Sequence, residues 1–220
     1  METLFVFVVS FIFLPTMKEQ IILKSKELFL QYGFKSVTMD DIAKEMGISK
    51  KTIYAHFENK TKLIEATTFF VFESICDGID HICDISENPI QELYDIKKFV
   101  MSCLNDEKTS PQYQLKKFYP HIFEALQKKQ FEKMNGSVKE SLEKGVETGV
   151  FRKNIDTEFT SRMYFNGMNG IKDKSIFPSQ EFLMPSLIES YLEYHLRAIV
   201  TEKGLKLLNK FINHNSSINA

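Results

Sequence analysis

The chain has 220 residues, a formal net charge of −1, and 43% hydrophobic and 26% charged residues, which is typical of a folded protein and not of a disordered one. Its 9 glycines and 6 prolines are too few for a turn-rich all-β fold, and 3 cysteines suit a reducing cytoplasm better than a disulfide scaffold. Because the whole chain is not basic, any nucleic acid must be bound through a local patch.

The first sixteen residues differ in character from the rest. Residues 3–14 form an apolar run followed by Pro15, which is shorter than the roughly 20 residues of a membrane-spanning helix. No Lys or Arg precedes this run and no small-residue cleavage site follows it, so it is also a poor signal peptide. We favour Met17 as the true start and residues 1–16 as a non-native leader. A membrane anchor, or a segment that packs on the body, are the alternatives.

Helical periodicity dominates from residue 18 onward and predicts an all-α fold. Ile21, Leu28 and Phe29 share one face of a helix over 18–32, which Gly33 ends. Capping residues then predict the next three helices: Thr38 caps 39–46, Ser49 caps 50–56 and Asn59 caps 60–84.

Further helices are expected in the second part of the chain, at 90–105, 111–118, 121–148, 156–171, 181–200 and 203–213. The polar residues 214–220 are expected to form a frayed tail. We place the domain boundary near residue 65, between a small unit of three short helices, 17–64, and a larger helical body, 65–213.

The small unit contains a helix-turn-helix pattern. Residues 38–57 read TMDDIAKEMGISKKTIYAHF, which predicts two short capped helices joined at a glycine. Gly47 permits the positive φ that the turn needs. Ile42 and Ile53 would pack the two helices together.

The second of these helices carries side chains suited to DNA. Lys50, Lys51 and Thr52 lie on its exposed first turn, where they would meet base edges in a major groove. The other candidates would contact phosphates or hold the helix N-terminus towards them. The predicted DNA-binding residues are Thr38, Ser49, Lys50, Lys51, Thr52, Tyr54, His56 and Lys60. For the two lysines the alternative is a solvated helix face, and for Tyr54 a place in the core.

Here a family resemblance becomes specific. The stretch 21–63 resembles the DNA-binding domain of the tetracycline-repressor (TetR) family of transcriptional regulators. The matching residues are Leu28-Phe29, Gly33-Phe34, Thr38, Asp41-Ile42-Ala43, Gly47-Ile48-Ser49, Thr52-Ile53-Tyr54, His56-Phe57, Lys60 and Leu63. The family often has Ala where Met46 stands and Gly where Lys51 stands, so no relative's base preference transfers to this chain.

The resemblance continues more weakly in the body. Residues 143–156, EKGVETGVFRKNID, resemble the family's junction before its last two long helices. In relatives those helices form a four-helix dimer interface, which here implies 156–171 and 181–200. Gly167 and Gly170 would allow close helix approach. The interface residues implied are Phe159, Met163, Leu183, Leu187, Tyr191 and Leu192.

Aromatic residues of the body are candidates for an apolar ligand pocket. Pro120 would break a helix nearby and could shape such a cavity. The candidate pocket residues are Tyr113, Phe118, Tyr119, His121, Phe123 and Tyr164. For each of them a plain core position is the alternative.

Three acidic residues and a histidine form a candidate metal site. Asp77, Asp80, His81 and Asp84 share a helical face at generic spacing. We prefer a solvated acidic face with an Asp77–His81 contact, and we predict that Cys76 and Cys83, on the apolar side, are buried thiols. No metal and no cofactor is expected.

The resemblance implies a cytoplasmic, homodimeric DNA-binding regulator, most simply a ligand-responsive repressor on a palindromic operator. Its expected partners are double-stranded DNA, a second copy of the chain and a small hydrophobic or amphipathic effector, with no membrane. One alternative is an activator or effector-independent DNA binder of the same fold. Another is a helical ligand-binding protein whose DNA-binding unit no longer functions. No nucleophile elbow, phosphate loop or paired metal motif supports an enzyme.

Overall fold

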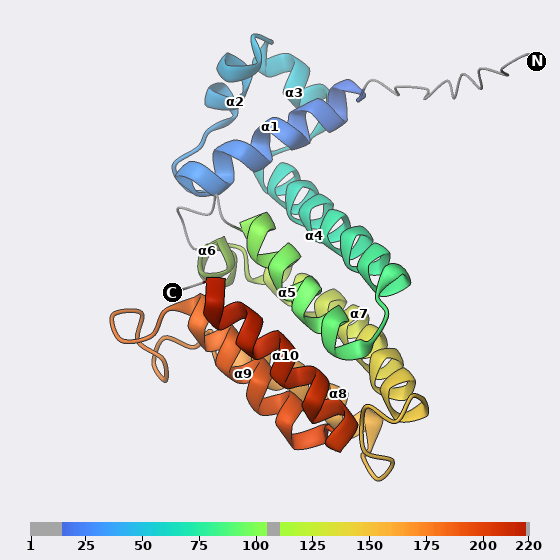
Figure 1. Cartoon of the computed structure of the whole chain (residues 1–220). Helices are drawn as coiled ribbons and strands as arrows, with labels where there is room; N and C mark the ends of the chain where they lie inside the picture. Colours follow the sequence, from blue (N-terminus) through green and yellow to red (C-terminus); the bar gives the residue numbers. More distant parts are fainter. Residues whose placement is uncertain (1–14, 105–110, 219–220) are drawn as a thin grey trace, which may run out of the picture.

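A computed structural model describes residues 15–104 and 111–218, and this part of the chain is almost entirely helical (Figure 1). Its helices are α1 (Met17–Tyr32), α2 (Met39–Met46), α3 (Lys50–His56), α4 (Lys60–Ile85), α5 (Pro89–Leu104), α6 (Pro111–Phe118), α7 (Pro120–Glu147), α8 (Thr157–Gly170), α9 (Met184–Ile199) and α10 (Glu202–Ile218). The predicted all-α fold is confirmed. We call α1–α3 the head and α5–α10 the body; α4 runs from the head along one side of the body.

Most predicted helix bounds lie within a residue or two of those observed, and two ends differ. The helix expected to start at residue 181 starts at Met184, with Pro185 in its first turn. A proline ring clashes with the carbonyl four residues earlier, so the helix does not extend back to Glu181. The last helix continues to Ile218, through residues that we expected to fray.

The helix α1 has its cap inside the expected leader. Thr16 Oγ1 accepts a hydrogen bond from the Glu19 N–H, and the Glu19 carboxylate accepts from the Thr16 N–H. This reciprocal capping box satisfies donors that the first helical turn leaves unpaired. Residues 1–14, which include the apolar run, lie outside the described residues, so the leader hypothesis stays a prediction.

The head and the body share one hydrophobic core. Head residues such as Phe29 and Ile53 are buried together with Leu115 of α6 and with Ile122 and Leu126 of α7. The predicted boundary at residue 65 falls inside the continuous helix α4. The head is therefore fixed to the body on two sides, by α4 and by the α6–α7 corner.

A second core lies inside the body. It joins Tyr94 of α5 and Leu142 of α7 with Leu192 and Leu196 of α9 and with Leu208 of α10. In Figure 1, α8, α9 and α10 lie beside one another at the end of the body away from the head.

The junction between α7 and α8 completes this core. Gly149 has a φ of 70°, which glycine adopts without strain, and the turn buries Val150 and Phe151. Phe151 forms an isolated antiparallel bridge with Val200, the residue that follows α9. The segment identified from its resemblance to the family junction thus ties two distant parts of the body together.

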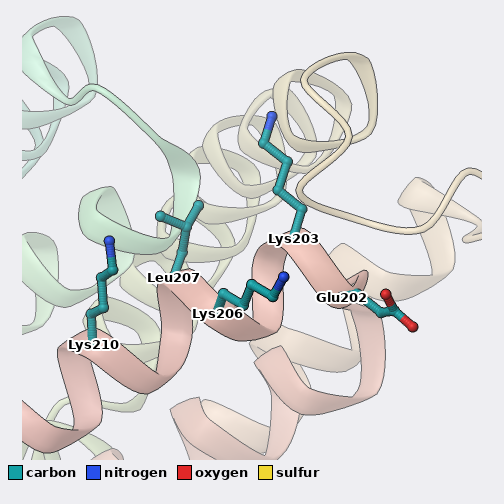
Figure 2. Close-up of a pocket in the computed structure, with 5 residues that line it drawn as sticks. All are labelled: Glu202, Lys203, Lys206, Leu207 and Lys210. Atoms are coloured by element: carbon teal, nitrogen blue, oxygen red, sulfur yellow. The ribbon is translucent and has the colours of Figure 1, made fainter.

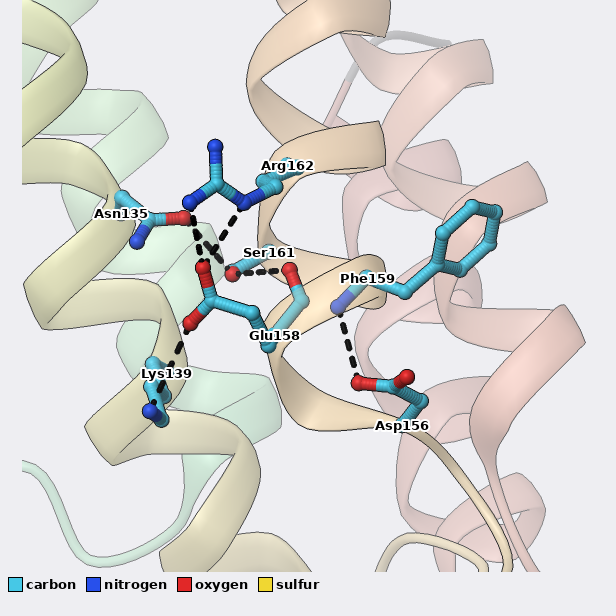
Figure 3. Close-up of polar contacts among 7 residues, drawn as sticks. All are labelled: Asn135, Lys139, Asp156, Glu158, Phe159, Ser161 and Arg162. Carbon is cyan, nitrogen blue, oxygen red and sulfur yellow. Dashed lines mark hydrogen bonds and ion pairs between the residues drawn. The ribbon is translucent and has the colours of Figure 1, made fainter.

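Polar contacts hold α8 against α7 (Figure 3). Ser161 Oγ donates to Asn135 Oδ1 at 2.8 Å, and Glu158 contacts both Arg162 and, at 3.5 Å, Lys139 of α7. Asp156 caps α8 by accepting from the Phe159 N–H at 3.0 Å. The phenyl ring of Phe159 points away from this network in Figure 3.

Within the described ranges, no helix has the length and apolar character needed to cross a membrane.

Candidate DNA-binding surface

The first helix of the helix-turn-helix begins at a complete capping box. Thr38 Oγ1 accepts from the Asp41 N–H at 3.2 Å, and Asp41 Oδ2 accepts from the Thr38 N–H at 2.8 Å. The hydrogen bonds from Thr38 hold the pKa of the Asp41 carboxyl below its usual value. The predicted cap is therefore confirmed, and it fixes where α2 starts.

The turn and the start of α3 also follow the local sequence. Gly47 has a φ of 65° in the left-handed region, and its N–H donates to the Lys44 carbonyl at 3.1 Å. Ser49 Oγ then accepts from the Thr52 N–H at 3.1 Å and caps α3. These bonds pair backbone groups that helix ends leave free.

Apolar side chains set the angle between α2 and α3. Ile42 and Ile53 are fully buried, and Phe57 behind them is 4% exposed. Met46 and Ile48 are half-buried against the same core. With one side of α3 fixed in this way, its opposite side faces outward.

The outward side of α3 carries most of the predicted DNA-binding residues. Ser49, Lys50, Lys51, Tyr54 and His56 are exposed. Tyr54 is 44% exposed, so its alternative place in the core is wrong.

The two lysines at the start of α3 differ in their contacts. Lys50 forms an ion pair with Asp40 of α2 at 2.6 Å, and its Nζ also lies 6.0 Å from the ring centroid of Tyr54. The hydrogen bond from Lys50 to Asp40 raises the Lys50 pKa. Lys51 forms no ion pair within the described part of the chain. The Lys51 ammonium group is therefore not held by an ion pair among the described residues, whereas that of Lys50 is held by Asp40.

The remaining candidates lie beside α3. Thr38 is exposed next to it, while Thr52 and Lys60 are half-buried. Lys60 Nζ lies 3.5 Å from the Lys35 carbonyl, and partial burial lowers the Lys60 pKa. Sequence reasoning missed Asp40, because its pairing with Lys50 spans ten residues and depends on how α2 crosses α3.

The head is basic although the chain is not. Residues 17–64, which are the head with the start of α4, contain nine lysines and six acidic residues, whereas the whole chain has a net charge of −1. A local positive charge on the segment that holds α3 is the electrostatic requirement for attracting a phosphate backbone.

The structure does not bring the six predicted pocket residues together. Tyr113 is 59% exposed and Phe118 is 36% exposed, both beside Lys117, and His121 is exposed. The other three are at least partly buried, but in two different cores. Tyr119 and Phe123 pack against the core of the head, and Tyr164 lies in the core of the body.

One surface pocket has a different character from the expected apolar cavity. It has a volume of about 440 Å³, and all of its lining residues come from α10 (Figure 2). They are Glu202, Lys203, Lys206, Leu207 and Lys210. None of the predicted pocket residues lies there.

The predicted dimer-interface residues are mostly on the surface. Phe159, Met163 and Leu183 are 61%, 46% and 71% exposed. Leu187 and Tyr191 are half-buried. Leu192 is a correction: it is 1% exposed because it packs into the body's own core, so it is not available to a partner.

Of the two glycines predicted to allow close approach, only Gly167 does so in this chain. A Cβ at Gly167 would overlap the Tyr191 ring, whose hydroxyl donates to the Met163 carbonyl at 2.9 Å. Nothing lies within 4 Å of a Cβ built at Gly170.

The acidic face of α4 contains no metal site in the part of the chain that the structure describes. Asp80 pairs with Lys133 of α7 at 2.5 Å, and the described residues show no Asp77–His81 hydrogen bond. Cys76 and Cys83, predicted to be buried thiols, are half-buried. Burial raises the pKa of both thiols, that of Cys83 to about 11.

Comparison with known proteins agrees with this architecture. Residues 21–67 match the family described as "Bacterial regulatory proteins, tetR family". A solved TetR-family transcriptional regulator from Agrobacterium tumefaciens superposes with a TM-score of 0.65 at 15% identity, covering 84% of this chain and 97% of that one. At this identity the likeness establishes the fold. Residues 21–67 therefore form a helix-turn-helix domain that matches the tetR family, and the chain as a whole has the fold of a TetR-family transcriptional regulator.

Curated relatives are regulators too. An uncharacterised HTH-type transcriptional regulator of Bacillus subtilis, YdeS, is 28% identical over 143 residues, which cover 60% of this chain and 66% of YdeS. The IcaR negative regulator of the biofilm operon in Staphylococcus aureus is 33% identical over 72 residues, 33% of this chain and 37% of IcaR. Each match spans less than two thirds of the relative. By their names these relatives are regulators and not enzymes, which agrees with the expectation for this chain.

Proposed function

We propose that this chain is a cytoplasmic, homodimeric transcriptional repressor that binds a palindromic operator and releases it when a small ligand binds the body. The observation that carries the proposal is the outward side of α3. There Lys51 and Tyr54 are exposed on a basic head that matches the tetR family. The negative regulator IcaR among the relatives supports repression over activation.

In the proposed complex, α3 of each subunit enters a major groove. Lys51 and, after it leaves Asp40, Lys50 read base edges. Tyr54, His56, Thr38 and the half-buried Lys60 contact flanking phosphates. Phosphate contacts make the affinity salt-dependent, and the two-fold symmetry of a dimer requires two half-sites.

Exposed apolar side chains on α8 and before α9 support dimerisation. Phe159, Met163 and Leu183 are large, exposed and apolar, and Phe159 and Met163 are four residues apart on one face of α8. A contiguous apolar patch there would mark an interaction surface. Tyr194 on α9 is 73% exposed and is a further large apolar side chain on the helices proposed to form the interface.

Ligand control requires only that the ligand prefers a conformer that cannot bind DNA. A preference of about 5.5 kcal/mol shifts a 1:99 equilibrium to 99:1. The helix α4 and the α6–α7 corner, which both join the body to the head, would transmit the change.

The DNA-binding proposal is tested by fluorescence anisotropy on duplex DNA from upstream of the chain's own gene, against scrambled DNA, at two salt concentrations. We expect preferential, salt-sensitive binding. Lys51→Ala should weaken binding by about 1–3 kcal/mol and reduce the preference over scrambled DNA, because Lys51 reads base edges. Tyr54→Ala should weaken binding as well. Lys128→Ala, on an exposed face of α7, is the matched control. Equal affinity of Lys51→Ala and wild type would contradict the assigned surface.

The dimer is tested by light scattering coupled to size exclusion. Phe159→Glu places a charge on the proposed interface and should give a monomer. Ile85→Glu, which changes an equally exposed apolar residue at the end of α4, should leave the dimer intact. A wild-type monomer, or a Phe159→Glu dimer of unchanged stability, would count against this interface.

A further inference from the structure

A small polar pocket lies between three helices of the structure, away from α3. Its volume is about 170 Å³. It lies where the end of α4, the first turn of α5 and the second half of α7 meet. Its lining residues are Cys83, Asp84, Glu92, Ser137, Glu140, Ser141 and Lys144.

The pocket contains a deeply buried carboxylate. Glu92 is 4% exposed, because its neighbours Ile90, Leu93 and Tyr94 anchor the start of α5 in the core. Burying a carboxylate is costly unless charged or hydrogen-bonded partners compensate. Burial accordingly raises the Glu92 pKa, and only part of this effect is offset by its neighbours.

The nearest cation does not satisfy this carboxylate. Lys144 Nζ lies 4.0 Å from Glu92 Oε2, beyond hydrogen-bond distance. The same Nζ donates at 3.1 Å to the Ser86 carbonyl, just past the end of α4. Lys144 is therefore held by the backbone just past the end of α4, and it gives Glu92 no hydrogen bond.

A buried hydroxyl beside the carboxylate is also unpaired. Ser141 is 5% exposed, and its Oγ makes no hydrogen bond of acceptable geometry within the described residues. It lies close enough to Glu92 to help hold the carboxylate charge, as does the Cys83 thiol. An unpaired buried polar group costs free energy. The Glu92 carboxylate thus has only weak support from its neighbours, and the lone pairs of Ser141 Oγ have no donor within the described residues.

The lining determines which chemistry fits. Carboxylates come from all three helices, Asp84, Glu92 and Glu140, against the single cation Lys144, so an anion is disfavoured. No aromatic ring lines the pocket, so it lacks the cage that quaternary ammonium ions prefer. No group of His, Cys, Asp and Glu suited to a metal ion occurs in the described parts of the chain.

We infer that this pocket binds a small primary ammonium compound, whose N–H groups donate to the Glu92 carboxylate and to Ser141 Oγ. The ammonium group supplies a positive charge and N–H donors to the Glu92 carboxylate, and it supplies a donor to the lone pairs of Ser141 Oγ. The pocket admits only a few non-hydrogen atoms beyond that group. Its role as the effector site rests on the proposed function, because α4 runs from this pocket to the head.

The binding experiment uses the full chain and isothermal titration calorimetry with ethylammonium and ethanolammonium. Tetramethylammonium, ethanol and acetate serve as comparison ligands. We expect saturable binding of the two primary ammonium ions, with tetramethylammonium, ethanol and acetate at least about tenfold weaker. Acetate or ethanol binding as tightly as ethylammonium, or no saturable binding of either primary ammonium ion in the millimolar range, would overturn the inference.

Three variants locate the site. Glu92→Gln keeps the side-chain shape and removes the charge, and it should lower ethylammonium affinity at least about tenfold. Lys144→Met removes the competing cation and should raise the affinity. Glu87→Gln, an exposed residue before α5 that does not line the pocket, should change nothing. Circular dichroism confirms that each variant is folded. Unchanged binding in folded Glu92→Gln would overturn the inference.

A separate measurement keeps binding and regulation distinct. Calorimetry tests the pocket without DNA, whereas anisotropy of the DNA complex with and without ethylammonium tests control. Binding in the calorimeter with no change in DNA affinity would support the site and refute its role as an effector site. DNA release by ethylammonium that Glu92→Gln abolishes would support both.

Discussion

Gln114 of α6 accepts a hydrogen bond from the backbone N–H of Phe34, at an Oε1–N distance of 2.9 Å. The bond connects residues 80 positions apart and joins the body to the turn that ends α1. Gly33, with a φ of 84°, lies directly against the same amide group, and a Cβ there would come within 2.6 Å of it. The head is thus held to α6 by a specific polar contact as well as by the shared core.

Gln114→Ala should destabilise the chain, because it leaves the part-buried Phe34 N–H without its acceptor. The free energy of unfolding should fall by about 1 kcal/mol, which is the lower end of the cost of an unsatisfied buried donor. Urea denaturation measures it. Gln112→Ala, an exposed neighbour on α6, is the control. Equal effects of the two substitutions would show that the hydrogen bond contributes nothing.

Asp40→Asn should strengthen DNA binding. Asp40 holds Lys50 at 2.6 Å and places a negative charge beside the proposed phosphate contacts. Removing that charge frees Lys50 and removes a repulsion from the phosphates, so we expect the affinity to rise a few-fold and its salt dependence to increase. The anisotropy assay measures both, with Glu181→Gln in the exposed loop before α9 as the control. Weaker binding of Asp40→Asn would mean that the ion pair orients Lys50 productively.

Two glycines of α7 should respond in opposite ways to alanine. The ring of Phe151, which is fully buried, lies where a Cβ of Gly145 would be, whereas nothing lies within 4 Å of a Cβ at Gly136. Gly145→Ala should lower the free energy of unfolding by about 1–3 kcal/mol, because the added methyl group overpacks the core. Gly136→Ala should raise the free energy of unfolding by about 0.5–1 kcal/mol, because alanine favours the helix more than glycine does. Thermal or chemical unfolding of both variants decides the matter, and a stable Gly145→Ala would contradict the packing described.

His195 should make the chain sensitive to acid. It is 7% exposed, its ring lies 4.9 Å from that of Tyr164, and burial lowers its pKa from 6.5 to about 4. Between these values the unfolded chain binds a proton that the folded chain does not. The contribution of His195 to the free energy of unfolding is therefore fully present above about pH 6.5. It is lost as the pH drops to about 4, which lowers the free energy of unfolding by roughly 3 kcal/mol.

Unfolding free energies of wild type and His195→Gln across this pH range isolate the effect. The variant should show a shallower decline between pH 6.5 and about 4, whatever its absolute stability. His81→Gln, on an exposed position of α4, should keep the wild-type slope. The raised pKa of Glu92 has the opposite sign, since it lowers stability as the pH rises, and it is common to all three proteins. Parallel curves for wild type and His195→Gln would refute the assignment.

The sequence by itself determined the helices and the helix-turn-helix. Thr38, Gly47 and Ser49 act on backbone groups within about four residues of themselves, so their effects can be read without knowing the rest of the fold. The outward position of Lys51 was predicted in this way, and Lys51 is exposed. The tetR-type head and the junction around Phe151 were predicted from a family resemblance, and the head matches the family model over residues 21–67.

Only the tertiary structure decided which apolar face meets which partner. Leu183 and Leu192 are both apolar residues at or near α9, yet one is 71% exposed and the other 1%, because packing of the body selects one face of the helix and leaves the other. Helical periodicity cannot make that choice. The Lys50–Asp40 pair, the Gln114–Phe34 hydrogen bond and the buried Glu92 likewise depend on how separate helices cross. Local sequence signals do not encode such long-range contacts.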